Sequence, residues 1–384
     1  MRPFISLALF IASSCQFAGS TTYCDEPFEK CLCGEMEYVG RMQYVLNCTG
    51  HGFTNASILQ HLPQKTQVLI FVGNNIPKLP RNLLGTTNNN SQLRVIDMSN
   101  NKIEDILGQT FHHVPRVERL ILNHNEISIS FDQHHPRVFS NFQSLLELHL
   151  TNAFADNTPD DLAIDLHDIF NTSGLTKLRK LHLEDNEIKK FKDPKIFCEL
   201  NSLMDLHLGN NKLQHVNFKF DCLQHLRLID LERNSISYFK PEELESFDQM
   251  AKKQDRFVLD FSDNPLICGQ KTDDLYAWLQ KTQAEVRNKE RLRCKPSCPK
   301  EFEKTVLLSE HRKLSICPHL LKAEEGYSSS TVFLLSLALV LCLSLLIYTN
   351  RTPLKATLFP IIQNLSRKVH YTNIGKPEAQ EMDV

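Results

Sequence analysis

The stretch LRKLHLEDNEI, residues 178–188, is followed further along the chain by LMDLHLGNNKL, residues 203–213. The two copies share their leucines, an asparagine near the end, and a histidine between two leucines, His182 or His207. Side chains alternate between the two faces of a strand, so each copy predicts a short β-strand with leucines inside and its histidine outside. The spacing of the copies, roughly 20 to 29 residues, is typical of a structural repeat.

The template L-x-x-L-x-L-x-x-N-x-L recurs through most of the chain. A phased series of this kind is the leucine-rich-repeat pattern, in which each repeat buries its leucines against the next. We therefore predict an α/β leucine-rich-repeat solenoid with a curved parallel sheet. Ala153 replaces one consensus asparagine; the others fall at Asn74, Asn101, Asn125, Asn186, Asn211, Asn234 and Asn264.

The outward strand positions predict a binding face on the concave side of the sheet. Three histidines in this column could hold a metal ion or make binding depend on pH. We favour a solvated polar ladder, with no metal or cofactor, and keep the three histidines as a weaker metal candidate. The predicted face consists of Asp97, Ile121, His149, His182, His207 and Asp230, with Ile70 and Asp260 continuing the column at its ends.

The cysteines predict disulfide-bonded caps at both ends of the solenoid. Cys31 and Cys33 could belong to a zinc site, but no second pair stands at zinc spacing, so we favour disulfides in an oxidising compartment. Cys198 and Cys222 fall near the same phase of neighbouring repeats, where parallel strands are close enough for a bridge; two buried thiols are the alternative. The predicted disulfide cysteines are Cys24, Cys31, Cys33, Cys48, Cys198, Cys222, Cys268, Cys294, Cys298 and Cys317.

Two apolar segments predict a secreted N-terminus and a membrane anchor. The first, Phe4 to Ala12, follows Arg2 and precedes small residues, as in a cleavable signal peptide. The second, at 328–348, carries no charge and is long enough to span a bilayer. The positive residues that follow it favour a cytoplasmic tail, so we expect a single-pass type I protein of the plasma membrane with its N-terminus outside.

These observations predict a chain with seven parts. The insert 154–174 should form a bulging loop or a short helix, and Leu275, Trp278 and Leu279 should cover the open end of the core. The parts are a signal peptide at 1–20, an N-terminal cap at 21–60, repeats at 61–262, a C-terminal cap at 263–320, a linker at 321–327, a transmembrane helix at 328–348 and a tail at 349–384.

Composition and motifs argue against several classes of function. The net charge of −2 indicates no nucleic-acid partner, and glycine is scarce. The chain has no Gly-x-Ser-x-Gly motif, so we do not expect an enzyme. Asn-x-Ser/Thr sequons predict glycans, although Asn47 directly precedes a cysteine that should be paired. The predicted glycosylation sites are Asn47, Asn55, Asn89 and Asn171.

The C-terminal part resembles the trophoblast glycoprotein family, also called the Wnt-activated inhibitory factor family. ERLRCKPSCPKEFEKTVLLSE at 290–310 and YTNRTPLKATLFPIIQNLSRKVHYTNI at 348–374 carry the likeness, which extends over Phe257 to Ile374. The family has Cys-x-Cys at the start of this cap, whereas here Gly269 and Gln270 follow the first cysteine and an additional cysteine appears later. Compared with the family, this change suggests two pairs, Cys268 with Cys294 and Cys298 with Cys317.

The resemblance implies a cell-surface glycoprotein that binds extracellular or membrane proteins, Wnt pathway receptors among them, and inhibits Wnt/β-catenin signalling. The alternative is an adhesion or guidance receptor that uses the same face. The tail adds two candidate motifs for adaptors. Tyr371 and Ile374 form a Tyr-x-x-hydrophobic endocytic signal. Met382 and Val384 present a hydrophobic C-terminus to a PDZ groove, where the family has serine in place of the methionine.

Overall fold

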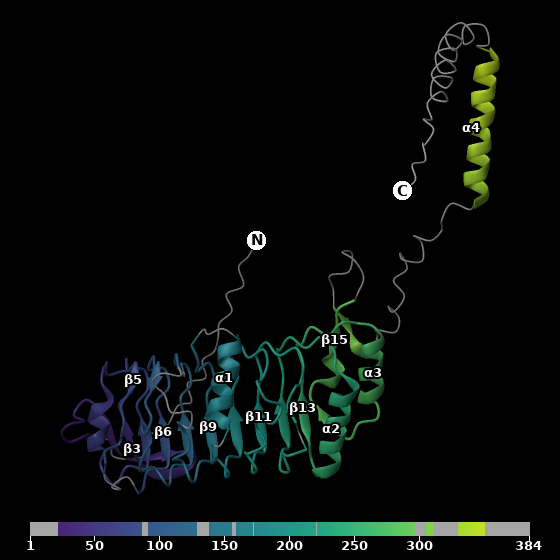
Figure 1. Ribbon diagram of the computed structural model, residues 1–384. Coiled ribbons are helices and arrows are strands. Elements are labelled where there is room, and N and C mark those ends of the chain that lie inside the picture. The colour runs from purple at the N-terminus through teal and green to yellow at the C-terminus, as the bar shows by residue number, and fades with distance from the viewer. Residues whose placement is uncertain are drawn as a thin grey trace, which may run out of the picture. The chain divides into compact units, whose positions relative to one another are not determined.

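A computed structural model of the protein describes residues 22–86, 91–128, 138–155, 159–171, 173–219, 221–296, 305–309 and 329–349. The chain divides into two compact units, Met1–Ser315 and Ile316–Val384. The first unit holds the repeats and both caps. The second contains one described helix, α4 (Ser329–Thr349). Figure 1 shows the repeats stacked side by side along the first unit.

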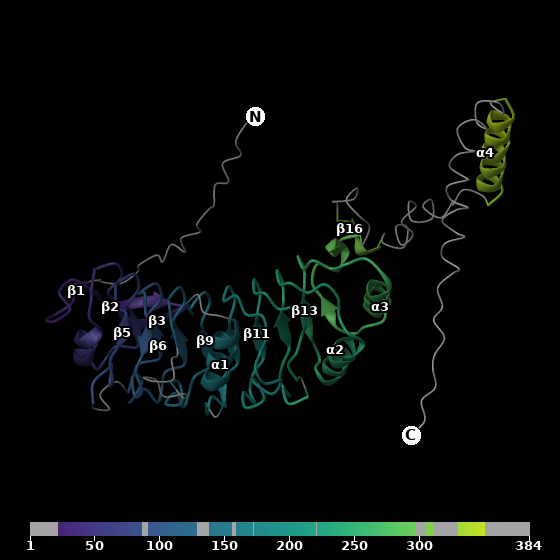
Figure 2. The ribbon, with the colours of Figure 1, turned by 45° about the horizontal axis from the view of Figure 1, so that its top comes forward.

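The main sheet of the first unit has 12 strands within the described residues. Its first two strand pairs are antiparallel, and every later pair is parallel, as the repeats predict. In order across the sheet, the strands are β1 (Thr22–Tyr23), β2 (Leu32–Tyr38), β3 (Arg41–Asn47), β4 (Val68–Ile70), β6 (Val95–Asp97), β8 (Arg119–Ile121), β9 (Glu147–His149), β10 (Lys180–His182), β11 (Asp205–His207), β12 (Leu228–Asp230), β13 (Val258–Asp260) and β14 (Glu285–Val286). Strands β6 to β13 follow one another along the unit in Figure 2.

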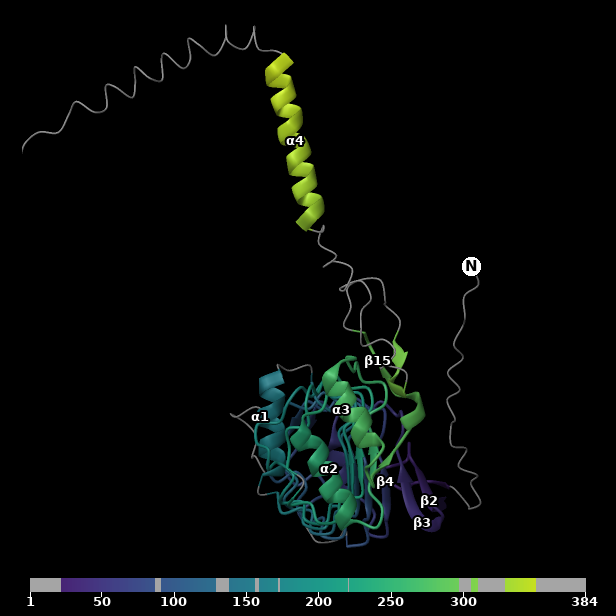
Figure 3. The ribbon, with the colours of Figure 1, turned by 90° about the vertical axis from the view of Figure 1, so that its right-hand side faces the viewer.

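Short elements connect the strands on the other side of the solenoid. Figure 3, which looks along the stack, shows α1 on the side opposite β2 and β3. Within the described residues of the first unit, the helices are α1 (Pro159–Phe170), α2 (Pro241–Lys253) and α3 (Gln270–Leu279), with 3₁₀ turns η1 (Ala56–His61) and η3 (Lys289–Arg291). Two small sheets pair β5 (Lys78–Leu79) with β7 (Asp105–Ile106) and β15 (Arg293–Cys294) with β16 (Val306–Leu307).

The repeat leucines form the core of the first unit. Leu181 lies opposite Leu206 in the parallel pairing of β10 with β11, and both side chains are fully buried. Leu148 continues the same row on β9. A row of leucine and isoleucine side chains is therefore buried from Leu46 on β3 to Leu259 on β13. This explains why the sequence repeats one line, because a single repeat would leave its apolar side chains in water.

The consensus asparagines form a second buried ladder next to the leucines. The backbone N–H of Asn74 donates to Asn101 Oδ1 at 2.8 Å, and that of Asn101 donates to Asn125 Oδ1 at 3.0 Å. Asn186 donates in the same way to Asn211 at 3.0 Å. Each amide thus satisfies backbone groups of the turn that cannot reach water.

The substitution at Ala153 interrupts this ladder. Without a side-chain amide at that position, the backbone N–H of Asn125 donates to the backbone oxygen of Asn152 at 3.2 Å. The N–H of Ala153 itself donates to Asn186 Oδ1 at 2.8 Å, where the ladder resumes. Helix α1 lies in the insert that follows. Of the two forms expected for this insert, a bulging loop or a short helix, the structure shows the helix.

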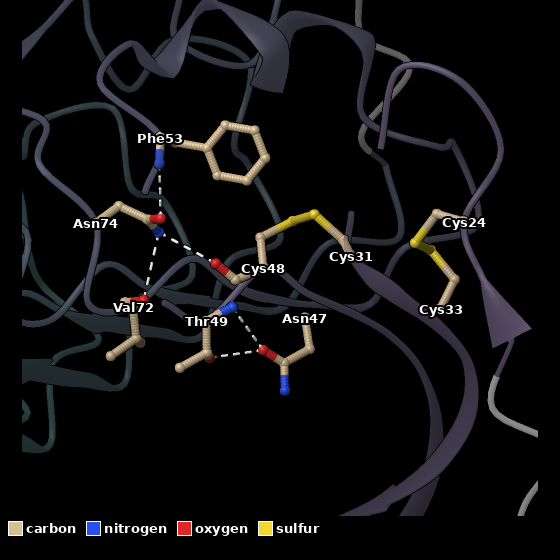
Figure 4. Close-up of a disulfide and its surroundings, with 9 residues drawn as sticks. All are labelled: Cys24, Cys31, Cys33, Asn47, Cys48, Thr49, Phe53, Val72 and Asn74. Carbon is tan, nitrogen blue, oxygen red and sulfur yellow. Dashed lines mark hydrogen bonds between the residues drawn. A yellow bond between two sulfur atoms is a disulfide. The ribbon is translucent and has the colours of Figure 1, made fainter. Parts of the chain in front are cut away.

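Four disulfides join described cysteines of the first unit. The N-terminal cap contains Cys24–Cys33 and Cys31–Cys48, which Figure 4 shows beside the first asparagine of the ladder, Asn74. Cys198 bridges to Cys222 across neighbouring repeats, with the two Cα atoms 5.2 Å apart. The C-terminal cap contains Cys268–Cys294. The remaining predicted pair, Cys298 and Cys317, lies outside the described residues.

Helix α3 closes the C-terminal end of the core. Leu275 and Leu279 are buried, and Trp278 is 9% exposed with its ring 6.2 Å from that of Phe247 on α2. The sequence predicted this lid from the helical spacing of the three residues of α3.

In the second unit, the side chains described in α4 are those of residues 334–345 and 348. Within the part of the chain that the structure describes, no helix is both long and apolar enough to cross a membrane.

Candidate binding face

Three stacked histidines mark the centre of the outward side of the sheet. His149, His182 and His207 lie in register on β9, β10 and β11. Adjacent ring centroids are 4.2 Å apart, and the rings are tilted by only 7–8°. This arrangement follows from the parallel pairing, because equal side chains on neighbouring strands repeat at about the strand spacing of 4.8 Å. We call these three residues the histidine row.

Carboxylates face the histidine row on both sides. His149 Nε2 lies 3.5 Å from Glu147 Oε2, and His182 Nδ1 lies 2.9 Å from Glu184 Oε1. His207 Nδ1 is 3.8 Å from that same oxygen of Glu184 and 3.8 Å from Asp230 Oδ2. The side chains of the row are only 20–23% exposed, so these polar groups have fixed partners.

The pair at the N-terminal end of the row shifts the pKa of both partners. The hydrogen bond from His149, followed by the charges of Arg119 and Lys180, holds the pKa of Glu147 well below its usual range, although burial opposes the shift. Burial lowers the pKa of His149 and outweighs the opposite effect of Glu147. At neutral pH the pair is therefore a carboxylate that accepts a hydrogen bond from a neutral imidazole.

Glu184 is also held as a carboxylate. Burial alone would raise its pKa, but the hydrogen bond and charge of His182, a backbone hydrogen bond and the hydroxyl of Thr151 together lower it. The Thr151 hydroxyl donates to Glu184 Oε2 at 2.9 Å. Glu184 Oε1 therefore remains available to His182 and His207, while the other oxygen is occupied.

Two cations anchor Glu147 from the neighbouring strands. Arg119 Nε on β8 lies 2.6 Å from Glu147 Oε2, and Lys180 Nζ on β10 lies 3.3 Å from Oε1. Burial raises the pKa of Tyr38, which lies next to Arg119, although that arginine opposes the shift. An ion-pair network thus spans three adjacent strands and fixes the orientation of the side chains across the face.

The ion pair of Glu147 with Lys180 separates two surface hollows. The first, of about 250 Å³, is lined by Glu147, Arg119 and the tip of the β2–β3 hairpin. The second, of about 570 Å³, is lined by Lys180, His182 and His207 together with Arg227, Arg256 and Arg287 from the following strands. We call the strip from the first hollow through the histidine row to the second hollow the sheet face.

The β2–β3 hairpin covers the outward side of the sheet at its N-terminal end. Met36 of β2 packs on Val45, Val68 and Val95, and all four side chains are buried. The hairpin thus covers the first strands with an apolar cluster and exposes Val39 at its tip, at 69%. The binding surface predicted from alternation is therefore shorter than the sheet, because its N-terminal end is already occupied by the cap.

The structure places the remaining predicted face residues on the same side. Asp97 and Ile121 are half-buried on β6 and β8, and Asp230 is half-buried on β12, next to the histidine row. Asp260 departs from the prediction: its carboxylate accepts hydrogen bonds from the N–H and hydroxyl of Ser262, and the residue is only 4% exposed. The solvent-accessible part of the outward column therefore ends at Asp230, because Asp260, its partner in register on β13, is buried.

The charged residues that contact the histidine row were not predicted from the alternation of strand side chains. Glu147 lies two positions before His149 and Glu184 two positions after His182, so both continue the outward phase of their strands. Extending the alternation by one step on each side would have found them. Arg119 was not foreseen either, although it begins β8 in the same phase.

The predicted modification and tail residues are only partly described. Asn55 and Asn171 are exposed. Asn47 is half-buried, and its Oδ1 accepts hydrogen bonds from the N–H and hydroxyl of Thr49, as Figure 4 shows. Outside the described residues lie Asn89, Tyr371, Ile374, Met382 and Val384.

Comparisons with known proteins agree with this architecture. The family model described as "Leucine rich repeat" matches residues 65–127 and 176–236. Trophoblast glycoprotein of Macaca fascicularis is 26% identical over 311 residues, which cover 77% of this chain and 70% of that protein. The chain is a leucine-rich-repeat protein related to trophoblast glycoprotein.

The chain is also similar to a second leucine-rich-repeat protein and to a solved structure. Lumican of Coturnix japonica is 32% identical over 170 residues, which cover 41% of this chain and 48% of lumican. The crystal structure of human trophoblast glycoprotein, also titled Wnt-activated inhibitory factor 1, shares the fold with a TM-score of 0.58 at 22% identity. That match covers 69% of this chain and 91% of the solved one.

Proposed function

We propose that this leucine-rich-repeat protein is a cell-surface glycoprotein whose sheet face binds an extracellular or membrane protein, and that this binding inhibits Wnt/β-catenin signalling. The observation that carries the proposal is the network of Arg119, Glu147 and Lys180 beside the histidine row. A partner that meets side chains already held in place loses less conformational entropy on binding. The proposed function is recognition of a protein partner, without catalysis.

The Wnt part of the proposal rests on the relationship to trophoblast glycoprotein, whose human member is titled Wnt-activated inhibitory factor 1. Wnt pathway receptors are accordingly the proposed partners. The disulfides support passage through an oxidising compartment. The signal peptide at 1–20, the type I span at 328–348 and glycans at the sequons stay predictions from the sequence, as do the PDZ and endocytic motifs of the tail.

The test is β-catenin reporter output in Wnt-stimulated cells that express the full chain. Wild type should lower the output. Lys180→Glu reverses the charge between the two hollows and sets it against Glu147, so we expect about tenfold weaker partner binding and a loss of inhibition. Lys189→Glu makes the same charge change at an exposed residue outside the strands and serves as the matched control.

Surface amounts must be matched between the variants by antibody labelling. Unchanged output with wild type would contradict the Wnt part of the proposal and favour an adhesion receptor. Equal loss of inhibition with Lys180→Glu and Lys189→Glu would contradict the sheet face as the binding surface. A third variant that lacks residues 349–384 tells whether inhibition needs the tail.

A further inference from the structure

Three potential ligand atoms lie close together beside the histidine row. His182, Glu184 and His207 each offer one such atom, and the three atoms all lie within 4.8 Å of one another. Glu184 Oε1 is 2.9 Å from His182 Nδ1 and 3.8 Å from His207 Nδ1. Two tetrahedral ligands at about 2.05 Å from a zinc ion are about 3.4 Å apart, a value between these two separations.

We propose that His182, Glu184 and His207 bind a zinc ion through three protein ligands. Imidazole nitrogen and carboxylate oxygen are common zinc ligands, and a set of two histidines and one glutamate leaves the fourth tetrahedral position open. Calcium and magnesium are poor candidates, because they take mainly oxygen ligands. The open position faces solvent on the sheet face, where water or a donor group of a bound protein completes the coordination.

The fold holds the ligands close enough without movement of the backbone. His182 and His207 are paired in register on β10 and β11, and Glu184 follows two residues after His182 in the same outward phase. The two rings are parallel within 7°, so their nitrogen lone pairs lie in parallel planes. Zinc binding therefore turns each imidazole about its Cβ–Cγ bond toward Glu184 Oε1, a soft rotation for a histidine.

His149 belongs to the same stack but lies outside the site. Its Nε2 faces Glu147, whose two oxygens are engaged by Arg119 and Lys180. Substitution of His149 thus removes one stacked ring and leaves all three proposed ligands in place. This makes His149→Ala the matched control for the ligand variants.

The experiment is zinc titration of the full chain, purified in a mild detergent and stripped of metal with a chelator. Isothermal titration with ZnCl₂ measures affinity and stoichiometry, and Co²⁺ substitution reports tetrahedral coordination by visible absorption. We expect one zinc ion per chain for wild type and for His149→Ala. His182→Ala, His207→Ala and Glu184→Gln should each bind at least about tenfold more weakly, since loss of a ligand costs no less than loss of a group behind it.

Absence of zinc binding to wild type would overturn the proposal. So would weakening by His149→Ala equal to that by His182→Ala, or affinity that no ligand variant changes. Near-ultraviolet circular dichroism of each variant shows whether it is folded, and Glu184→Gln keeps the shape of its side chain should an alanine variant fail to fold. The titration needs no partner, so its outcome is independent of the reporter test of the proposed function.

Discussion

The asparagine ladder and the histidine row each repeat one residue type in neighbouring repeats, the asparagines in buried turns after the strands and the histidines on the outward side of the sheet. The amide of Asn211 is buried, and its hydrogen bonds go to backbone groups of its own and the preceding repeat. The imidazole of His182 is 20% exposed, and its partners are the side chains of Glu184 and two other histidines. The repeated asparagines, which are buried, stabilise the solenoid. The repeated histidines, which face outward, leave polar groups available for binding.

The largest effect should come from breaking the inward ladder. Asn211 Oδ1 accepts from the N–H of Asn186 and Ile188, each at 3.0 Å, and Nδ2 donates to Leu183 and Leu208. Asn211→Ala leaves these buried groups without partners, so we expect a loss of about 3 kcal/mol in the free energy of unfolding. Urea denaturation followed by circular dichroism measures it.

The control for this prediction is Asn201→Ala, the same change at an exposed position between β10 and β11. It should alter the unfolding free energy by less than about 0.5 kcal/mol. Comparable losses in the two variants would show that the ladder does not carry the stability assigned to it.

The inward side is also what the sequence predicted best. The template specified the buried leucines, the asparagines and the parallel register, because each repeat must satisfy the same packing and the same turn. The template did not predict α2, although the sequence carries signals of a helix there. Proline and two glutamates stand in its first turn and two lysines in its last: Pro241, Glu242, Glu243, Lys252 and Lys253. A template search passes over such signals because they lie between the repeats.

The outward side was predicted only in part. Alternation placed His149, His182 and His207 on one face, but Val68 is covered by Met36 of the β2–β3 hairpin. This packing is a tertiary contact of the cap, and the repeat pattern contains no information about it. The convergence of Glu184 on two histidines likewise depends on side-chain rotamers that the pattern does not set.

A smaller effect is expected on stability when the outward row is broken. His182→Ala removes ring contacts on both sides and the hydrogen bond to Glu184. Because the site is partly solvated, water replaces much of what is lost, and we expect destabilisation of about 1 kcal/mol. The same urea experiment applies, and a loss as large as that of Asn211→Ala would contradict the division between a structural ladder and a binding row.

The smallest expected effect is a dependence of folding stability on pH that arises from His149 of the histidine row. The folded protein holds the pKa of His149 below its ordinary value of 6.5, chiefly through burial, against the opposing effect of Glu147 and together with the charges of His182 and Arg119. As pH falls through 6.5, the unfolded chain takes up a proton at this histidine before the folded chain does. Acid therefore favours the unfolded state, and stability that is present above pH 6.5 is lost below it.

The lowered pKa values of Glu147 and Glu184 act with the same sign in a more acidic window, below their ordinary value of 4.5. The thermal midpoint of wild type should therefore fall between about pH 7.5 and about pH 5.5, before these carboxylates contribute. His149→Gln removes the titrating group and keeps a hydrogen-bond donor near Glu147, so its midpoint should fall less over the same interval. Equal falls in the two proteins would mean that His149 titrates alike in the folded and unfolded chains, and that the row is as solvated as an ordinary surface.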